Sequence, residues 1–576
     1  MANPIEILTR RLEPAFAAVA TPGVPAPPAL RRSDRADYQA DGALALARLL
    51  RRSPRDIASD VVKAADLGDL CESVEVSGPG FINLTLRTET LATLIGRMVA
   101  DERLDVAADT PAEIVVVDYS APNVAKEMHV GHLRSTVIGD AITRLYDFLG
   151  NHVIRQNHLG DWGTPFGMLV EHLTEVGEAD ATLSQGDLTA FYQQARHKFD
   201  TDEAFKERSR RRVVALQSGD PETLRLWGVL YDHSSRYFQY VYERLGVLLT
   251  PADDDGESRY NPMLPSVVDE LDALGLLEIS EGAQCVFPPG FTNRQGEPLP
   301  MIVRKADGGY GYAATDLACI RMRAREFGAT RMAYVVGTPQ REHFQMVFAV
   351  ARMAGWITDK HDVRHVEFGS VLGPDRKVLR TRSGESVKLI DLLDEGVERA
   401  AAQVRSKLPD LDEPSVAAVA TAVGIGAIKY ADLSSDRVKD YVFDWDRMLS
   451  FDGNTAPYLQ YAHTRIRSIF RRAGEGGTVA YPYVPRLTEP AERTLALALL
   501  GFEEAVRASA ERYQPHRLCG YLYELATVFT TFYETCPVLR AGDAQTRASR
   551  LTLCDLTARV LNTGLGLLGI DAPDRM

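Results

Sequence analysis

The residues best suited to chemistry are two histidines, His129 and His132, which flank Gly131 in the run DYSAPNVAKEMHVGH at 118–132. The first turn of a helix has unpaired backbone N–H groups and the positive end of the helix dipole, so it attracts phosphate. A glycine lets a nucleotide lie close to the backbone, and imidazole N–H groups donate to phosphate oxygens. The pattern predicts a phosphate site. Two alternatives stay open, namely a His-x-x-His metal site and ordinary surface or core histidines.

A strand and a helix must position these histidines. Residues 114–117 (IVVV) are short, β-branched and wholly apolar, which is typical of a strand covered on both faces of a parallel sheet. Residues 132–149 carry an apolar stripe at helical spacing, and Gly150 ends the predicted helix. A second strand begins at 153–154. The sequence therefore predicts a β-α-β unit around the histidines.

The α/β pattern is interrupted and then resumes. Residues from about 173 to 300 alternate helical and turn-rich pieces, which indicates an insertion. A strand at 331–337, a helix at 342–355 and a strand at 365–368 follow. Further helices are expected at 458–472, 491–512 and 516–533. We therefore predict an α/β nucleotide-binding domain that is followed by an almost wholly helical region from Lys388 onward.

The composition indicates a large globular protein without a membrane-spanning segment. Of 576 residues, 45% are hydrophobic and 25% are charged, which is ordinary for folded domains. No run reaches the roughly 18 uncharged apolar residues that a membrane helix needs, and the N-terminus lacks the apolar core of a secretion signal. The 6 cysteines form no C-x-x-C pair. They predict neither a zinc site nor a disulfide framework and fit a reducing cytoplasm.

The net charge of −14 is unusual for a protein that binds nucleic acid, because phosphates are normally contacted by Lys and Arg. Net charge constrains solubility more than it constrains a local site. Arg-rich stretches at 208–212 and 465–472 can form basic tracks on an acidic protein. Solvated helix faces explain each stretch equally well.

The run from Asp118 to Gly163, including NHLGDWG at 157–163, closely resembles the nucleotide site of class I aminoacyl-tRNA synthetases. Within that class it is similar to the arginyl-tRNA synthetases, over nearly the whole chain. The resemblance implies an enzyme that activates L-arginine with ATP and transfers it to the 3′-terminal adenosine of tRNA(Arg). AMP and diphosphate are the expected products. Mg²⁺ is expected with ATP, no metal site of the protein's own is expected, and a cytoplasmic monomer is implied.

The same resemblance implies a domain organisation. Residues 1–111 correspond to an N-terminal α+β module that contacts the tRNA elbow. Residues 112–390 correspond to a Rossmann-like, parallel-sheet catalytic domain that contains the insertion. A helical connecting region over 391–450 and an all-helical anticodon-binding domain over 451–576 complete the chain.

Several residues receive an ATP-binding or catalytic role from the resemblance. His129, Gly131 and His132 stand in the place of the HIGH motif. The mobile basic loop of the class, KMSKS, matches degenerately at Lys377-Val-Leu-Arg380-Thr-Arg, where Arg380 replaces the second lysine. A basic surface turn is the alternative for this loop. Lys126 stands just before the HIGH-like run and is expected to compensate, because an ammonium there can neutralise phosphate charge.

The resemblance also implies an arginine pocket. A guanidinium is a planar fork of donors that pairs with carboxylates in a partly dry site. Asp118, at the end of the first strand, and Asp316, with Tyr312 before it, are expected to hold the guanidinium. Asn123 and Gln340 match the polar contacts to the other end of the amino acid. Each acid alone is equally well explained as a strand end or a helix cap.

Contacts with transfer RNA are expected at both ends of the chain. Phe81 and Asn83, in the strand-like run 80–86, would meet a D-loop base. Asn454, Tyr458 and Gln460 open the helical domain with amides and an aromatic ring, which suit splayed anticodon bases. Buried core is the alternative for Phe81 and for the tyrosine.

Two functions of another kind stay open. A non-catalytic relative would bind tRNA or arginine as a sensor, which only the degenerate loop makes plausible. The site residues that are intact argue against it, namely Lys126, His129, His132, Asp118 and Asp316. An adenylate-forming ligase would use the same nucleotide fold without RNA. The likeness of both flanking regions to RNA-binding domains speaks against the second.

Overall fold

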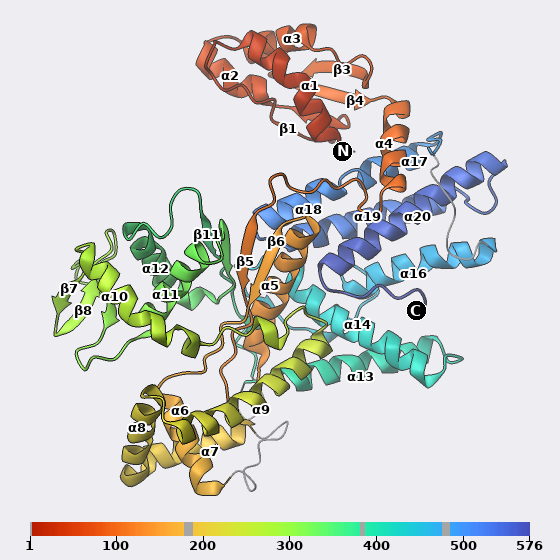
Figure 1. Cartoon of the computed structure of the whole chain (residues 1–576). Coiled ribbons are helices and arrows are strands. Elements are labelled where there is room, and N and C mark those ends of the chain that lie inside the picture. The colour runs from red at the N-terminus through yellow and green to blue at the C-terminus, as the bar shows by residue number, and fades with distance from the viewer. Residues whose placement is uncertain (1–2, 178–187, 381–385, 475–483) are drawn as a thin grey trace.

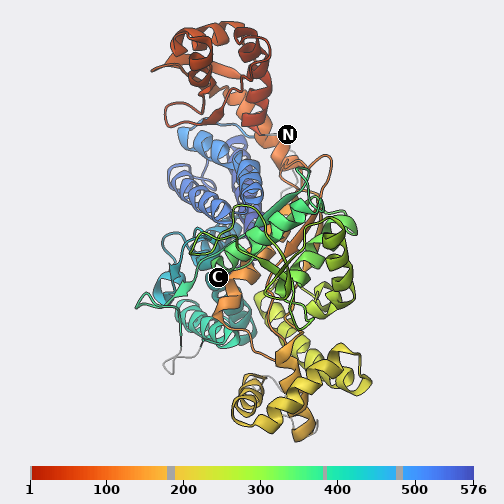
Figure 2. The same cartoon turned by 90° about the vertical axis from the view of Figure 1, so that its left-hand side faces the viewer.

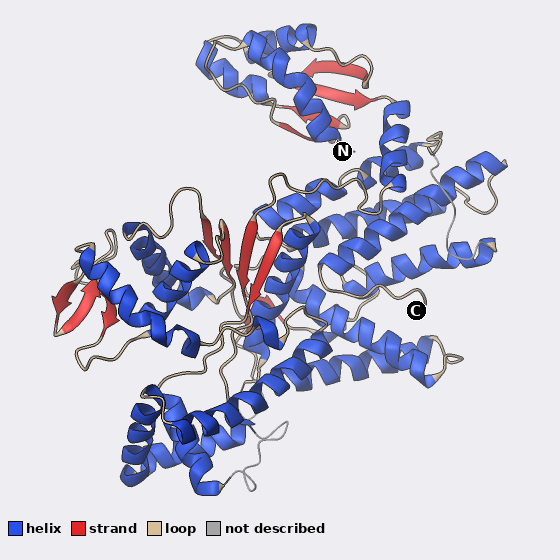
Figure 3. Ribbon diagram, viewed as in Figure 1, coloured by secondary structure: helices blue, strands red, loops and turns tan. Residues whose placement is uncertain are grey.

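The computed structural model describes residues 3–177, 188–380, 386–474 and 484–576 (Figure 1). A parallel sheet of four strands lies at its centre, in the order β11-β10-β5-β6, with helices on both sides (Figure 3). The N-terminal module stands at one end of an elongated molecule, and the helices α6 to α8 stand at the other (Figure 2).

β5 (Ile114–Asp118) is a central strand of this sheet. It pairs in parallel with β10 (Arg331–Tyr334) and with β6 (His152–Gln156), while β11 (Asp362–His365) forms one edge. The side chains at 115–117 are fully buried because both faces of the strand are covered, and β-branched residues suit such a place. The predicted buried parallel strand is confirmed.

Alternate residues of β5 face two separate apolar cores. Val117 packs in the core that contains α5 (Val130–Phe148). Val116 packs in the core built from α11 (Tyr312–Arg325) and α12 (Arg341–Met353). The period of two along a strand thus places helices on both sides of the sheet.

The strand predicted at 365–368 is wrong in its position. β11 ends at His365, and Val366 and Phe368 lie buried in the connection that follows. An apolar run signals burial, but burial alone does not distinguish a strand from a buried connection. The predicted helix at 342–355 is confirmed as α12.

The predicted insertion consists of two different pieces. The first is helical, and the second combines a helix with a small antiparallel sheet in the order β7-β8-β9. The elements are α6 (Thr164–Val176), α7 (Leu188–Thr201), α8 (Glu203–Gln217), α9 (Pro221–Leu245), η1 (Pro251–Asp253), η2 (Glu257–Met263), α10 (Leu264–Ala273), β7 (Glu278–Ser280), β8 (Ala283–Val286) and β9 (Met301–Arg304), with η3 (Thr338–Gln340) before α12.

The Arg-rich stretch at 208–212 is partly neutralised within the insertion. Arg208 and Arg212 of α8 lie 2.7 and 3.2 Å from the carboxylate of Glu171 on α6. Both guanidinium groups therefore join two helices of the insertion. Their charge is not fully available for a basic track.

The N-terminal module contains an antiparallel sheet in the order β1-β2-β4-β3. The strand predicted at 80–86 is confirmed as β4. A helix, α4, leaves the module and contacts the C-terminal helices, where Arg559 donates to the carbonyl oxygens of Val99 and Asp101. The elements are α1 (Pro4–Val19), β1 (Leu30–Arg32), β2 (Tyr38–Ala40), α2 (Gly42–Leu50), α3 (Pro54–Ala64), β3 (Cys71–Ser77), β4 (Phe81–Leu86) and α4 (Thr88–Ala100).

The C-terminal region is helical, as predicted, apart from a two-residue strand that pairs in parallel with β12. Two of its expected helices are confirmed as α16 and α19. The elements are β12 (Val371–Leu372), α13 (Leu389–Lys407), α14 (Glu413–Leu433), β13 (Tyr441–Val442), α15 (Trp445–Met448), α16 (Ala456–Ala473), α17 (Pro490–Leu499), α18 (Phe502–Glu511), α19 (His516–Thr535) and α20 (Ala544–Leu567).

The single helix expected at 491–512 is in fact two helices, α17 and α18. Arg32 of the N-terminal module donates to the carbonyl oxygen of Leu497 over 2.7 Å. At the break, a Cβ on Gly501 would lie 2.2 Å from Arg32 Nη2. The turn therefore admits a side chain from a distant segment, which local periodicity does not reveal.

One described helix, α14, is long and apolar enough to cross a membrane by length and composition, and 72% of its apolar window is buried inside the protein. The helix holds no uncharged apolar run of about 18 residues, because Lys429 interrupts its apolar segment. α14 packs against α13 and α16, and a Cβ on Gly424 would lie 2.6 Å from the carbonyl oxygen of Gly396 on α13. Its apolar surface thus serves helix packing.

A buried ion pair joins the beginning of α5 to the end of α14. Arg134 Nε lies 3.2 Å from the carboxylate of Asp432, and both side chains are at most 1% exposed. Arg134 also donates to the carbonyl oxygen of Lys439 over 2.9 Å. Removal of one partner would leave an uncompensated charge in the interior, which is costly.

Arg134→Met is therefore expected to lower the free energy of unfolding by about 3–5 kcal/mol. The double variant Arg134→Met, Asp432→Asn removes both charges and is expected to recover a large part of this loss. Denaturant unfolding measures both effects, with the exposed pair partner Arg405→Met as a control that changes stability by less than about 1 kcal/mol. A double variant no more stable than the single one would contradict this account.

Candidate active site

The connection from β5 to α5 has an uncommon backbone conformation. Ser120, Ala121 and Ala125 have φ of 74°, 50° and 62°, a region that side-chain-bearing residues seldom adopt. Ser120 N–H donates to Ser135 Oγ over 2.9 Å. Ala125 N–H donates to Ser234 Oγ over 2.8 Å. Buried hydroxyl groups of neighbouring helices therefore fix the shape of this loop.

His129 and His132 form a reciprocal cap at the start of α5. Gly131 N–H donates to His129 Nδ1 over 3.0 Å, and His129 N–H donates to His132 Nδ1 over 3.0 Å. The ring centroids lie 4.1 Å apart. Each ring thus accepts a backbone proton at Nδ1 and is held in one orientation.

These hydrogen bonds determine which atoms the two rings can offer a ligand. Burial lowers the pKa of His132 to about 3, and burial together with the charge of Lys126 lowers the pKa of His129. Both rings are therefore neutral near pH 7. Because Nδ1 is the acceptor in each ring, the proton lies on Nε2, which is a donor. Two Nε2–H donors suit phosphate oxygens and do not suit a metal ion.

Lys126 is held against the helical insertion. Its Nζ lies 4.4 Å from the ring centroid of Tyr192 on α7. A cation over an aromatic face is attracted by the ring quadrupole. The ammonium therefore has a defined place in the segment that leads to His129.

The predicted basic loop begins as a short hairpin after β12. Isolated bridges join Leu372 to Val378 and Arg380 to Ser386. Lys377 and Arg380 are exposed. The last part of the predicted motif, including Arg382, lies outside the described residues.

The carboxylate of Asp118 accepts a hydrogen bond from another side chain of the protein. Its Oδ2 accepts a hydrogen bond from Arg323 Nη2 over 2.8 Å, and Arg323 is fully buried. The same guanidinium donates to Gln156 and lies 3.5 Å from Asp255. Asp118 ends β5 as predicted, but it is not a free acid.

Asp316 lies on the face of α11 that points towards this group. Its Oδ2 lies 2.6 Å from His343 Nε2, and its side chain is 17% exposed. The hydrogen bond with Asp316 raises the pKa of His343. Cys319 and Arg323 follow Asp316 at helical spacing, whereas Tyr312, the first residue of α11, is 74% exposed. The structure brings Asp118 and Asp316 to one site and leaves the tyrosine side chain in solvent.

His158 stands between these acids. Burial by itself lowers the pKa of His158, but Asp255 and the charges of Asp118 and Asp316 raise it to about 9. The imidazole is therefore a cation near pH 7. The surrounding acids therefore stabilise a positive charge on His158.

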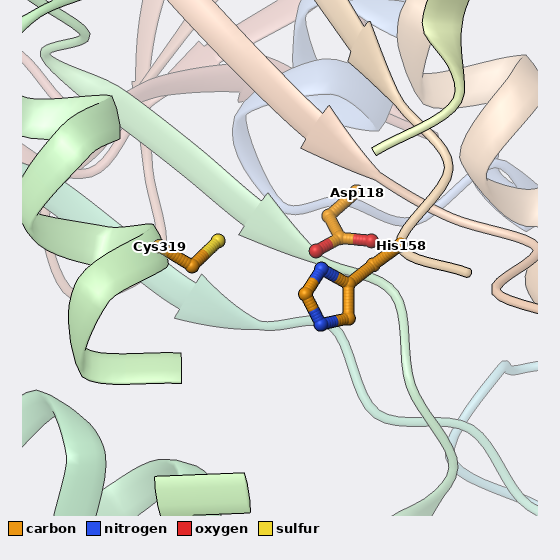
Figure 4. Close-up of side chains that lie close together, drawn as sticks. All are labelled: Asp118, His158 and Cys319. Atoms are coloured by element: carbon orange, nitrogen blue, oxygen red, sulfur yellow. The ribbon is translucent and has the colours of Figure 1, made fainter. Parts of the chain in front are cut away.

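Asp118, His158 and Cys319 have the ligand types of a metal site, with ligand atoms within 4.8 Å of one another (Figure 4). Their surroundings do not fit a metal ion. Burial raises the pKa of the Cys319 thiol well above its usual range, His158 is protonated, and the Arg323 guanidinium lies on Asp118. The acids of this site are therefore paired with the Arg323 guanidinium and the His158 imidazole of the chain itself.

Asn123 and Gln340 are both exposed. Asn123 forms a parallel bridge with Gly160, where a Cβ on Gly160 would lie 2.3 Å from Asn123 Oδ1. Gln340 is exposed at the start of α12. Both side chains are open to a ligand.

Phe81 and Asn83 point from one face of β4. Phe81 is half-buried, whereas Asn83 is buried and donates to Ser77 Oγ over 2.8 Å. Asn83 Oδ1 is buried without a hydrogen-bond partner. The structure places the pair side by side, with the aromatic ring nearer to solvent.

The three residues predicted to meet the anticodon differ in exposure. Asn454 is exposed and accepts a hydrogen bond from the Tyr430 hydroxyl over 2.6 Å, while Tyr458 is half-buried. Gln460 is fully buried, and its amide donates to the carbonyl oxygens of Ala422 and Asp571. The expectation that Gln460 contacts RNA is therefore corrected. Its amide is used to join α14, α16 and the C-terminal segment.

Sequence reasoning missed Arg323 and His158. Arg323 lies seven positions after Asp316 and so on the same helix face, a spacing that could have indicated it. His158 stands inside the NHLGDWG run, but nothing in the sequence places it beside Asp118.

His158→Gln is expected to lower the thermal midpoint at about pH 6 and to have little effect at about pH 10. The folded-state pKa is raised, so the stabilisation is fully present below the unfolded pKa and is lost as pH rises through about 9. Thermal melting over this pH range measures the effect, with exposed His197→Gln as a control. An equal loss at both pH values would show that the charge of His158 contributes nothing.

Three family models match successive segments of the chain. The family model described as tRNA synthetases class I (R), catalytic domain, matches residues 95–445. The Arginyl tRNA synthetase N terminal domain matches residues 6–86, and the DALR anticodon binding domain matches residues 459–576.

Relatives of the same kind cover the full length. The arginine–tRNA ligase of Thermobifida fusca is 55% identical over 100% of both chains, and that of Frankia casuarinae is 52% identical over 96% of this chain and 95% of the relative. The arginyl-tRNA synthetase of Plasmodium falciparum superposes with a TM-score of 0.87 at 29% identity, covering 100% of this chain and 99% of the other. That of Thermus thermophilus superposes at 0.83 with 25% identity over 100% of both. The chain therefore belongs to the arginyl-tRNA synthetase family.

Proposed function

We propose that the protein is an arginine–tRNA ligase. It activates L-arginine with ATP to arginyl-adenylate and transfers arginine to the 3′-terminal adenosine of tRNA(Arg), with release of AMP and diphosphate. The observation that carries the proposal is the reciprocal cap of His129 and His132, which presents two neutral Nε2–H donors at the start of a helix. The names of the full-length relatives support it.

The chemistry needs positioning and no covalent nucleophile. An oxygen of the arginine carboxylate attacks the α-phosphorus of ATP, and the bond to the bridging oxygen breaks as diphosphate leaves. The ribose hydroxyl of the terminal adenosine then attacks the acyl carbon, and AMP leaves. His129, Gly131 and His132 stabilise the charge on the α-phosphate through N–H donors.

Lys126 supplies positive charge on the phosphate side of the site. Its ammonium stands three positions before His129 and neutralises the charge of the ATP phosphates. Lys377 and Arg380 contact the same phosphates from the basic loop. Mg²⁺ enters bound to ATP, because hard cations take phosphate oxygens.

The arginine side chain lies at the ends of β5 and α11. Asp316 pairs with the guanidinium, and Asp118, which Arg323 holds in place, adds negative charge behind it. Tyr312 covers the guanidinium from the start of α11. Asn123 and Gln340 bind the α-amino and carboxylate groups.

Transfer RNA contacts both the N-terminal module and the helical C-terminal domain. Phe81, backed by Asn83, meets the elbow from the module at 1–111, and Asn454 and Tyr458 meet the anticodon from the domain at 451–576. The N-terminal module and the domain at 451–576 contact each other directly, for example where Arg493 pairs with Asp37. We place the protein in the cytoplasm as a monomer, in keeping with six buried, unpaired cysteines.

Purified protein is expected to charge total transfer RNA with arginine alone when each standard amino acid is tested with ATP. A pocket of buried acids rejects side chains without a matching cation, because unpaired carboxylates are costly. Incorporation of another amino acid would refute the pocket assignment. Binding of transfer RNA without any charging would favour a sensor.

Lys126→Met is expected to lower kcat for aminoacylation about 100-fold, whereas Arg380→Met lowers it less than tenfold. Lys126 is ordered beside the histidines, and Arg380 is exposed on the loop. Steady-state charging assays measure the difference, and thermal midpoints control for folding. A greater loss with the Arg380 variant would reverse the ranking.

A further inference from the structure

The segment before α5 is tied to the chain that returns from the basic loop. Val130 N–H donates to the carbonyl oxygen of Val387 over 2.9 Å, and Leu389 N–H donates to that of Met128 over 2.9 Å. An antiparallel bridge between His129 and Lys388 lies between these bonds. The start of α13 is thus joined, backbone to backbone, to a residue that caps α5.

A buried carboxylate reinforces this bridge. Glu127 has a side chain that is 2% exposed, and its carboxylate lies 2.8 Å from Lys388 Nζ. A buried carboxylate is costly unless a cation lies beside it. The ion pair therefore adds a side-chain contact to the two backbone hydrogen bonds.

The side chains of Lys126 and Glu127 contact different elements. Lys126 lies against Tyr192 of α7, and Glu127 N–H donates to Thr189 Oγ1 of the same helix over 3.4 Å. The Glu127 side chain turns instead towards Lys388. The phosphate-facing segment is consequently held from the insertion on one side and from α13 on the other.

We propose that the Glu127–Lys388 ion pair is a positioning contact, which sets the place of Lys126 and the histidine cap relative to α13. The inference rests on the proposed function, because positioning is measured through arginine activation. Neither residue touches substrate. The pair acts through the backbone of residues 126–130, which carries the groups that contact ATP.

The test separates positioning from simple stabilisation. Lys388→Met keeps the aliphatic stem and leaves Glu127 as an unpaired buried charge, so both the thermal midpoint and kcat fall. The double variant Glu127→Gln, Lys388→Met removes both charges. If the pair positions the segment, the double variant recovers the thermal midpoint while kcat for arginine-dependent ATP–pyrophosphate exchange, with tRNA present, stays about tenfold low.

Other variants complete the design. Lys388→Arg keeps the cation and is expected to retain kcat within about twofold. The KM for arginine is expected to stay unchanged in all of them, because the acids of the arginine pocket lie on other elements. Lys206→Met, which removes the cation from a pair with Glu203 on the insertion, is the matched control.

A double variant with the kcat of the wild type would overturn the proposal, because stabilisation would then explain the pair completely. A rise in the KM for arginine that accounts for the whole loss would also overturn it. Failure of the wild-type protein to activate arginine would instead refute the proposed function. The two failures are therefore distinguished by the wild-type assay alone.

Discussion

The ion pair of Arg134 with Asp432 is a fully buried contact that joins the helix after the central strand to the C-terminal helices. Arg134 lies just inside α5, the helix whose first turn carries the histidine cap. Asp432 lies at the end of α14, and the same guanidinium reaches the backbone that leads to β13. β13 pairs with β12, from which the basic loop departs. One buried charge pair therefore links the helix that carries the histidine cap to the strand that carries the loop.

The two ends of the candidate substrate site use opposite electrostatics. At the phosphate end the histidines are neutral donors, and the positive charge is supplied by Lys126. At the other end acids cluster around β5 and α11, and the cationic groups of Arg323 and His158 lie beside them. An amino acid with a cationic side chain and an anionic carboxylate fits this polarity in one direction only.

Local sequence predicted the parts of the structure that depend on short-range pattern. The apolar run at 114–117 became a central strand, and the stripe at 132–149 became α5, because burial on a sheet imposes these periods. The sequence also placed the two histidines at the start of this helix, but their reciprocal cap was not predicted. The roles expected for individual site residues came from the family resemblance and not from periodicity.

The rest depends on contacts between distant segments. Arg323 pairs with Asp118 across 205 positions, and Arg32 enters the break between α17 and α18 across 465 positions. Gln460 stands in a loop-to-helix passage that suits RNA, yet its amide is used by carbonyl groups 38 and 111 positions away. No local pattern specifies such partners.

The N-terminal module is fastened to the helical domain by side chains from that domain. Arg493 lies 2.6 Å from Asp37, and Arg559 binds the end of α4. For an RNA that touches both the module and the helical domain, the second contact then forms within one complex and at a high effective concentration. Weak recognition by each of the two domains is thereby sufficient for tight binding of an RNA that reaches both. An RNA that reaches only one of them gains nothing from the other.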